Sequence, residues 1–243
     1  MGSIPMPHNA PKNIGTLNAK PLHESLKRWC AQPGDRFEVP LDGFVVDIIH
    51  GDLLIEVQTQ NFSAIKRKLE RLAANHPVRL VYPIPYEKWV ARQAEDGTII
   101  GRRRSPKRGG FEALFEELVS IPELPKCRNF SVQLLLIREE EVRRHDSNRC
   151  WRRRGWVTHE RRLLAVVGQR LLEKPEDMLA FVPPALADPF TASDLASSLA
   201  RSPRLARMMI YCLRKAGCVA TVGKRGKAPL YARSGGRAIS GSQ

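Results

Sequence analysis

Residues Phe44–Thr59, with the sequence FVVDIIHGDLLIEVQT, are the stretch from which we interpret the rest of the chain. Phe44–Ile49 and Leu53–Gln58 are rich in β-branched and apolar residues, as strands are. The His-Gly-Asp sequence between them favours a tight turn. The stretch therefore predicts two short antiparallel strands joined as a hairpin.

This hairpin brings two carboxylates together. With a two-residue Gly-Asp loop, Asp47 lies directly opposite Glu56. Gln58 points to the same face, because side chains alternate along a strand. Like charges opposite each other destabilise a hairpin, and Mg²⁺, which takes oxygen ligands, would neutralise such a pair. We therefore predict a metal site here; the alternative is a half-buried hairpin with solvated carboxylates.

The same residues resemble a known signature. An Asp, a short hairpin and then Glu-x-Lys is the signature of the restriction-endonuclease-like superfamily, also called PD-(D/E)XK nucleases. Asp47 and the Glu56-Val57-Gln58 sequence resemble it, with Gln58 at the position where Lys is usual. Gln at this position is compatible with an active nuclease and with an inactive member, so the resemblance leaves both open.

Two further segments are similar to the same family. Glu24, within the helical segment Leu22–Cys30, is similar to the acidic residue that many members carry on their first helix. Phe62–Asn75 resembles the helix that follows the motif strand. The resemblance implies Mg²⁺ or Mn²⁺ as the cofactor and DNA as the partner. It implies Glu24, Asp47 and Glu56 as metal ligands, and Asp47, Glu56 and Gln58 as catalytic residues.

The composition restricts the partners. The 243-residue chain has a formal net charge of +15 and a pI of about 10.1. This charge favours a polyanion, with nucleic acid ahead of an anionic membrane surface. No apolar run approaches the length of a membrane span, and no signal-like segment opens the chain. Five scattered cysteines form no CxxC pair, which favours a reducing cytoplasm over a disulfide frame or a zinc site.

The segments after the hairpin predict an α/β fold. Phe62–Asn75 has an amphipathic helical pattern, with its many cations, including Lys68, on a solvated face. Val78–Ile84 is apolar enough for a strand buried on both faces. A helix between two strands returns the chain to the same sheet, so we expect a mixed sheet flanked by helices. Further strands are expected at Trp89–Gln93, Thr98–Arg102 and Phe130–Ile137, and a helix at Phe111–Val119.

A basic segment follows the second expected hairpin. Five of the nine residues from Arg102 to Gly110 are cationic, and Pro with a Gly pair predicts an irregular loop. Such a loop can follow a phosphate backbone, because each Lys or Arg contact releases counterions. A disordered basic linker is the alternative. The candidate DNA contacts in this segment are Arg102, Arg103, Arg104, Lys107 and Arg108.

The charge is unevenly distributed along the chain. Residues 1–150 hold 23 Lys and Arg against 19 Asp and Glu, whereas residues 151–243 hold 17 against 6. We therefore expect a second, strongly basic domain. The expected parts are a flexible lead-in at 1–19, a PD-(D/E)XK nuclease-like domain at 20–150, a winged-helix DNA-binding domain at 151–235 and a flexible tail at 236–243.

The order of elements in the second domain resembles a winged helix-turn-helix. We expect helices at Thr158–Leu172, Ala192–Ala200 and Pro203–Ala216, and then a hairpin with Lys224–Lys227 at its tip. The last helix would read a DNA groove, and the hairpin tip would be the wing. A winged helix that binds only protein is the alternative. The candidate DNA contacts here are Arg204, Arg207, Lys224, Arg225 and Lys227.

Three functional hypotheses follow. The first is a Mg²⁺-dependent DNA endonuclease that hydrolyses phosphodiester bonds and is targeted by the winged helix. In it, the metal would lower the pKa of a water, and Gln58 would orient that water or a phosphate oxygen. The second is a catalytically inactive, nuclease-like DNA-binding or regulatory protein. The third is a scaffold whose winged helix binds protein. The sequence leaves open whether the chain forms a homodimer or needs a partner protein.

Overall fold

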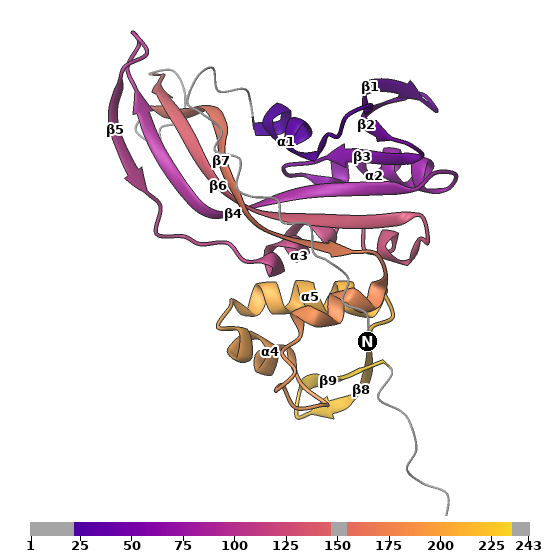
Figure 1. Ribbon diagram of the computed structural model, residues 1–243. Coiled ribbons are helices and arrows are strands. Elements are labelled where there is room, and N and C mark those ends of the chain that lie inside the picture. The colour runs from indigo at the N-terminus through magenta and orange to yellow at the C-terminus, as the bar shows by residue number, and fades with distance from the viewer. Residues whose placement is uncertain (1–21, 147–154, 235–243) are drawn as a thin grey trace, which may run out of the picture. The chain divides into compact units, whose positions relative to one another are not determined.

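The computed structural model describes residues 22–146 and 155–234 of the chain, drawn as ribbons in Figure 1. The lead-in expected at 1–19 and the tail expected at 236–243 lie outside the described residues. In the described part, a mixed sheet of seven strands is flanked by helices and accompanied by a separate two-stranded hairpin. The α/β class expected from the sequence is therefore confirmed.

The sheet begins with three antiparallel strands. The strand order is β1-β2-β3-β4-β6-β7, and β5 pairs with β4 outside this path. β3 runs parallel to β4, because a helix between them carries the chain back before it re-enters the sheet. The strands are β1 (Arg36–Leu41), β2 (Phe44–His50), β3 (Leu53–Val57), β4 (Val78–Gln93), β5 (Ile99–Arg104), β6 (Phe130–His145) and β7 (Trp156–Leu172).

The β2–β3 hairpin has the predicted register. Ile48 pairs with Ile55, and Gly51-Asp52 forms the loop. Gly51 has a φ of 55°, which glycine adopts without the steric cost that other residues have. Consecutive residues are buried in both strands, Ile48 and Ile49 in β2 and Leu54–Val57 in β3, so the hairpin is covered on both faces.

The helices bury one apolar stripe each. On α2, Phe62, Leu69 and Leu72 are completely buried, at positions that lie on one helix face. The Phe62 ring packs edge-on against Tyr82 of β4, with the centroids 5.0 Å apart. No helix of the described residues is long and apolar enough to cross a membrane. The part of the chain that holds the sheet strands contains helices α1 (Leu22–Cys30), α2 (Phe62–Ala73) and α3 (Leu114–Leu118) and the 3-10 turns η1 (Phe111–Ala113) and η2 (Leu124–Lys126).

The helix predicted at Thr158–Leu172 is wrong, because this segment lies in strand β7. Its apolar residues come close together in sequence, and such a run does not distinguish a helix from a buried strand by spacing alone. Pairing with β6 decides the conformation, and the neighbouring Val166 and Val167 suit a strand. Residues 156–172 therefore belong to the sheet and are not the first helix of a winged helix.

The other elements of the C-terminal module occur as predicted. Thr191 caps α4: its hydroxyl accepts a hydrogen bond from the Asp194 amide, and the Asp194 carboxylate accepts one from the Thr191 amide. Helix α5 packs against α4 and α3 and also contacts β8. The module consists of η4 (Pro175–Phe181), α4 (Ala192–Leu199), α5 (Pro203–Lys215), β8 (Val219–Arg225) and β9 (Ala228–Arg233).

The basic segment is more regular than the sequence predicted. Arg102–Arg104 belong to β5 and pair with Trp89–Ala91 of β4. Arg102 was expected to end the strand Thr98–Arg102, and it lies in β5. The prediction of an irregular loop is wrong for Arg103 and Arg104, because β4 extends beyond its apolar start and pairs with them. The loop after them is tied back to β4 by a hydrogen bond from the Gly109 amide to the Pro85 carbonyl, 3.0 Å long.

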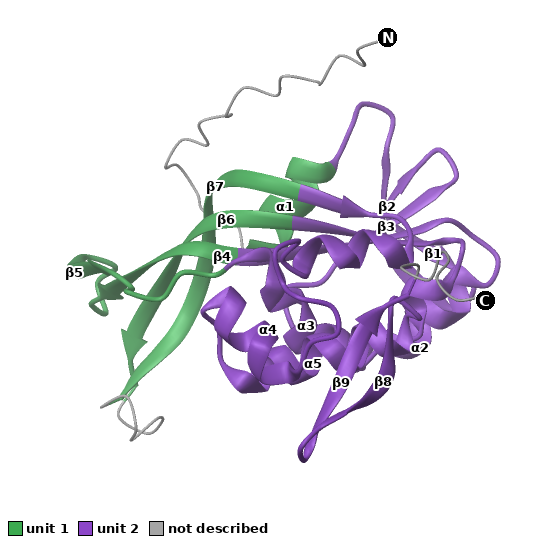
Figure 2. Cartoon of the chain, turned by 90° about the horizontal axis from the view of Figure 1, so that it is seen from below, with its two compact units in different colours: residues 1–30, 85–109, 135–169 green, residues 31–84, 110–134, 170–243 purple. Residues whose placement is uncertain are grey.

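The chain forms two compact units, coloured separately in Figure 2. Unit 1 comprises residues 1–30, 85–109 and 135–169, and unit 2 comprises residues 31–84, 110–134 and 170–243. Strands β4, β6 and β7 contribute to both units. Asp47 and Glu56 belong to unit 2, and Glu24 belongs to unit 1. The domain limits expected from the sequence remain a prediction.

Candidate functional site

The two carboxylates of the hairpin lie on neighbouring strands. The register that pairs Ile48 with Ile55 places Asp47 opposite Glu56, on one face of the sheet. Here the Asp47 side chain joins the hydrogen bonding between the two strands: its Oδ2 accepts a hydrogen bond from the Val57 backbone amide, 2.8 Å long. The strand pairing therefore fixes where the Asp47 carboxylate lies.

Glu56 is the more buried of the two acids, with 4% of the residue exposed. Its Oε2 lies 2.6 Å from Nζ of Lys68 on α2. Burial raises the pKa of Glu56 to about 7 despite this ammonium, and the charge of Asp47 acts in the same direction as burial. Oε1 of Glu56 is buried and has no hydrogen-bond partner among the described residues.

Lys68 is the residue of this site that sequence reasoning missed. We expected it on a solvated helix face, as its exposed neighbour Arg67 is. Instead, 16% of its side chain is exposed, and Nζ also donates to the Val45 carbonyl at 2.6 Å. The signal was its position: Lys68 follows Ile65 by three residues and precedes Leu72 by four, so it lies beside the apolar stripe.

Gln58 takes part in a different contact. Its Nε2 donates to the carbonyls of Gln60 and Asn61, the latter at 3.3 Å. The side chain therefore ties the end of β3 to the loop before α2. The cation beside Glu56 comes from α2 and not from the position at which the signature places a lysine.

Glu24 makes its described contacts within its own helix. Its carboxylate lies 2.9 Å from Nζ of Lys27 and 3.5 Å from Nδ1 of His23. The hydrogen bond from Lys27 outweighs burial and lowers the pKa of Glu24. In residues 22–146 and 155–234, no group of three or more His, Cys, Asp or Glu is arranged to hold a metal ion. The three-acid ligand set remains a prediction.

The predicted DNA contacts of the C-terminal module are exposed. Arg204 and Arg207 lie on one stripe of α5 together with Tyr211, which is 43% exposed. These positions differ by three and four residues, so they share a helix face. At the hairpin tip, Lys224, Arg225 and Lys227 are also exposed, and Arg225 forms an ion pair with Asp194 of α4.

The cations of the basic segment are exposed as well, but they do not point the same way. Arg102 and Arg104 share one face of β5, and Arg103 points to the other face. Arg108 follows in the loop, where Nη1 donates to the Tyr86 hydroxyl at 3.2 Å. The exposed set is Arg102, Arg103, Arg104, Lys107 and Arg108.

Comparison with known proteins connects this geometry to a family. Residues 20–173 match the Domain of unknown function (DUF8091). The chain belongs to the DUF8091 family. It is also 28% identical over 219 residues to an "Uncharacterized protein" of Treponema pallidum (strain Nichols). The aligned region covers 90% of this chain and 86% of the relative. No solved structure matches the chain significantly.

The DUF8091 region coincides with the sheet. It ends at residue 173, directly after β7, and contains all seven sheet strands together with α1, α2 and α3. Asp47, Glu56 and Lys68 lie inside it. The module formed by α4, α5 and the β8–β9 hairpin lies outside it. The carboxylate pair is therefore part of the DUF8091 region, whereas the C-terminal cations are an addition to it.

Proposed function

We propose that this DUF8091 protein is a Mg²⁺-dependent DNA endonuclease of the restriction-endonuclease-like type, with a C-terminal winged helix that binds DNA. The observation that carries the proposal is the group formed by Asp47, Glu56 and Lys68 beside the β2–β3 hairpin. The element order supports it: an acid-bearing α1, the hairpin, α2, and β4 returning parallel to β3.

Asp47 and Glu56 fit a hard divalent cation. The buried Oε1 of Glu56 lacks a hydrogen-bond partner among the described residues, and the raised pKa of Glu56 shows that one ammonium does not offset its burial. A second cation nearby would favour the ionised carboxylate. Oxygen ligands suit Mg²⁺ or Mn²⁺. When bound, such an ion lowers the pKa of water and stabilises charge on a scissile phosphate.

Lys68 would supply the positive charge that Gln58 lacks. A lysine ammonium has three donors, and the described contacts with Glu56 and Val45 use two of them. The third donor is available to a phosphate oxygen held beside the two carboxylates. In this arrangement Lys68 neutralises Glu56 and orients the substrate, while Gln58 keeps α2 in place through the loop that precedes it.

The C-terminal module supports a DNA partner. The exposed stripe of Arg204, Arg207 and Tyr211 on α5 provides guanidinium groups for phosphates and base edges. Lys224 and Lys227 provide exposed charge at the hairpin tip. Four cysteines of the described residues are free thiols, which supports action in a reducing cytoplasm.

The alternative is a DNA-binding or regulatory protein that does not cleave. The ion pair between Lys68 and Glu56 favours it, because Lys68 partly neutralises the buried acid without any metal. In that case Asp47 and Glu56 would serve the fold alone.

Cleavage of plasmid, single-stranded and branched DNA with Mg²⁺ or Mn²⁺ separates the two functions. Asp47→Asn, Glu56→Gln and Lys68→Met should each slow divalent-dependent cleavage by about a thousandfold, since each removes several kcal/mol of transition-state stabilisation. For Asp47→Asn and Glu56→Gln, binding of DNA with a chelator present should stay unchanged. Arg67→Gln, an exposed cation next to Lys68, is the matched control and should cleave like the parent.

A parent protein that cleaves none of these substrates with either metal, yet binds DNA, would establish the alternative. Equal rates for the parent and Asp47→Asn would show that any observed cleavage comes from a contaminant or from another site.

A further inference from the structure

One face of the sheet in unit 1 carries arginines from three strands and a loop. Glu87 of β4 holds three of them: Arg104 at 2.5 Å, Arg138 at 3.1 Å and Arg108 at 3.7 Å. Two carboxylate oxygens thus serve three guanidinium groups. We call the surface formed by Arg104, Arg108 and Arg138, together with Arg102 and Arg162, the arginine face.

A second carboxylate repeats the pattern. Glu140 of β6 lies 2.7 Å from Arg102 of β5 and 3.8 Å from Arg162 of β7. Glu140 shares a face with Arg138, because the two are separated by one residue in β6. Arg162 also pairs with Glu160 at 3.0 Å. The arginine face therefore runs from β5 across β4 and β6 to β7.

The positive groups of this face are outermost. The side chains of Arg102, Arg104, Arg138 and Arg108 are 40% to 53% exposed, whereas those of Glu87 and Glu140 are 14% and 12% exposed. The carboxylates thus lie at the level of the sheet, and the guanidinium groups extend beyond them. Five arginines over three partly buried acids, Glu87, Glu140 and Glu160, leave a net positive surface.

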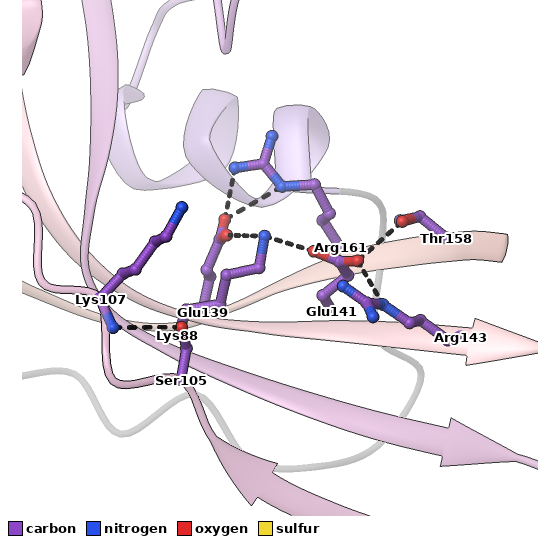
Figure 3. A network of polar contacts seen from close by, with 8 residues as sticks. All are labelled: Lys88, Ser105, Lys107, Glu139, Glu141, Arg143, Thr158 and Arg161. Atoms are coloured by element: carbon purple, nitrogen blue, oxygen red, sulfur yellow. Dashed lines mark hydrogen bonds and ion pairs between the residues drawn. The ribbon is translucent and has the colours of Figure 1, made fainter. Parts of the chain in front are cut away.

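The opposite face of the same strands is held by a buried network, shown in Figure 3. Lys88 lies between Glu139 and Glu141, at 3.4 Å from the former. Arg161 donates to Glu139, and Arg143 and Thr158 donate to Glu141. These contacts connect β4, β6 and β7, so β6 and β7, which present Arg138 and Arg162, are held together on the opposite face.

We propose that the arginine face binds the phosphate backbone of duplex DNA. Guanidinium groups are planar and fork-shaped, and they match phosphate oxygens in pairs, which lysine does not do. All five cations are arginines, and each is already oriented by a carboxylate, so little side-chain freedom is lost on binding. The inference rests on the proposed DNA partner and is independent of the proposed cleavage.

The surface suits a duplex better than a single strand. Single-strand binding needs exposed aromatic rings on which bases stack. Two half-buried aromatic residues of β4 contact these arginines: Trp89 carries Arg102 over its ring at 4.1 Å from the centroid, and Tyr86 carries Arg108 at 5.5 Å. Their stacking positions are therefore occupied. A duplex presents phosphates and hides its bases, which is what this surface can use.

Arg104→Gln with Arg138→Gln tests the proposal, with binding to a short duplex followed over a series of salt concentrations in chelator. Loss of two phosphate contacts should flatten the slope of log K against log salt by about 1.8, at about 0.9 per contact. If affinities converge near 1 M salt, binding at about 0.1 M salt weakens about 60-fold. Arg104→Lys with Arg138→Lys should keep the slope, because the charge is kept.

Two further variants make the outcome specific. Arg67→Gln with Arg71→Gln changes the net charge equally on the exposed side of α2 and should leave the slope close to that of the parent. Lys224→Gln with Lys227→Gln tests the C-terminal module separately. A parent that binds no DNA would remove the DNA partner of the proposed function.

A parent that binds DNA through the hairpin tip while the Arg104 and Arg138 variants retain the full slope would overturn only the arginine face. Equal losses for the glutamine and lysine pairs would assign these arginines a structural role. A loss confined to single-stranded DNA, or to anionic lipid vesicles tested in parallel, would also overturn the assignment to duplex DNA.

Discussion

The buried carboxyl of Glu56 makes the stability of this protein depend on pH in a measurable way. Its pKa in the folded protein is about 7, against an ordinary value of 4.5, because burial disfavours the charged form. The folded state therefore holds the proton more tightly than the unfolded state. Stability contributed by this group is present below pH 4.5 and is lost as the pH rises through 7. At about 1.4 kcal/mol per pKa unit, the loss is about 3 kcal/mol.

Glu56→Gln removes the titration and keeps the shape of the side chain. In metal-free buffer, the unfolding free energy of the parent minus that of Glu56→Gln should fall by about 3 kcal/mol between pH 4.5 and a pH above 7. All other titrating groups are common to both proteins, so they cancel in the difference. Urea denaturation followed by circular dichroism at several pH values measures it. A difference that stays constant with pH would refute the reasoning.

The same pair of proteins tests the metal site without substrate. Above pH 7, Mg²⁺ at about a hundred times its dissociation constant should stabilise the parent by about 2.7 kcal/mol. It should stabilise Glu56→Gln much less, because one carboxylate ligand is gone. Below pH 4.5 the effect on the parent should disappear, since Glu56 is then protonated. Equal stabilisation of both proteins would place the ion elsewhere.

Three other predictions concern the rest of the chain. Burial opposes ionisation of Glu141, but Lys88, Thr158 and Arg143 lower its pKa to about 2. The stability that this carboxylate contributes is therefore present above pH 4.5 and lost as the pH falls through 2. Glu141→Gln should cost about 3 kcal/mol of unfolding free energy at neutral pH and much less at pH 2, measured by urea denaturation. Phe62→Ala should cost about 4 kcal/mol in unfolding free energy, because the ring is completely buried; a loss below about 1 kcal/mol would contradict its place in the core. Lys224→Gln with Lys227→Gln should flatten the salt dependence of DNA binding by about 1.8, and adding Arg225→Gln should flatten it by about 0.9 more, because all three exposed cations are expected to contact phosphates.

The central hairpin was predictable because two independent constraints agree. Both strands are rich in apolar and β-branched residues, and the Gly51-Asp52 turn between them sets the register. That register places Asp47 opposite Glu56, and it depends on the hairpin alone. Helices α1, α2, α4 and α5 were predictable for a similar reason, since each has an apolar stripe and end signals in its own sequence.

Elements that depend on distant partners were not predictable. The apolar run in 156–172 suits a helix or a strand, and only pairing with β6 decides between them. Arg103 and Arg104 are polar residues in a basic run, so nothing local marks them as part of β5. Lys68 is one cation in a run of cations, and its contact with Glu56 depends on how α2 packs against the hairpin.

Counting charges along the sequence also gave an incomplete picture of where positive charge lies on the surface. Residues 139–141 are three consecutive glutamates, which lower the net charge of the first 150 residues. Because side chains alternate along β6, Glu140 points to one face and its two neighbours to the other. Glu140 is almost fully covered by Arg102 and Arg162, and the other two are buried in the network with Lys88. The exposed guanidinium groups come closer to an approaching phosphate than the carboxylates beneath them, so the arginines dominate the local potential at this surface. A segment that is nearly neutral by composition thus presents a basic surface. Duplex binding should therefore involve unit 1 as well as the C-terminal module.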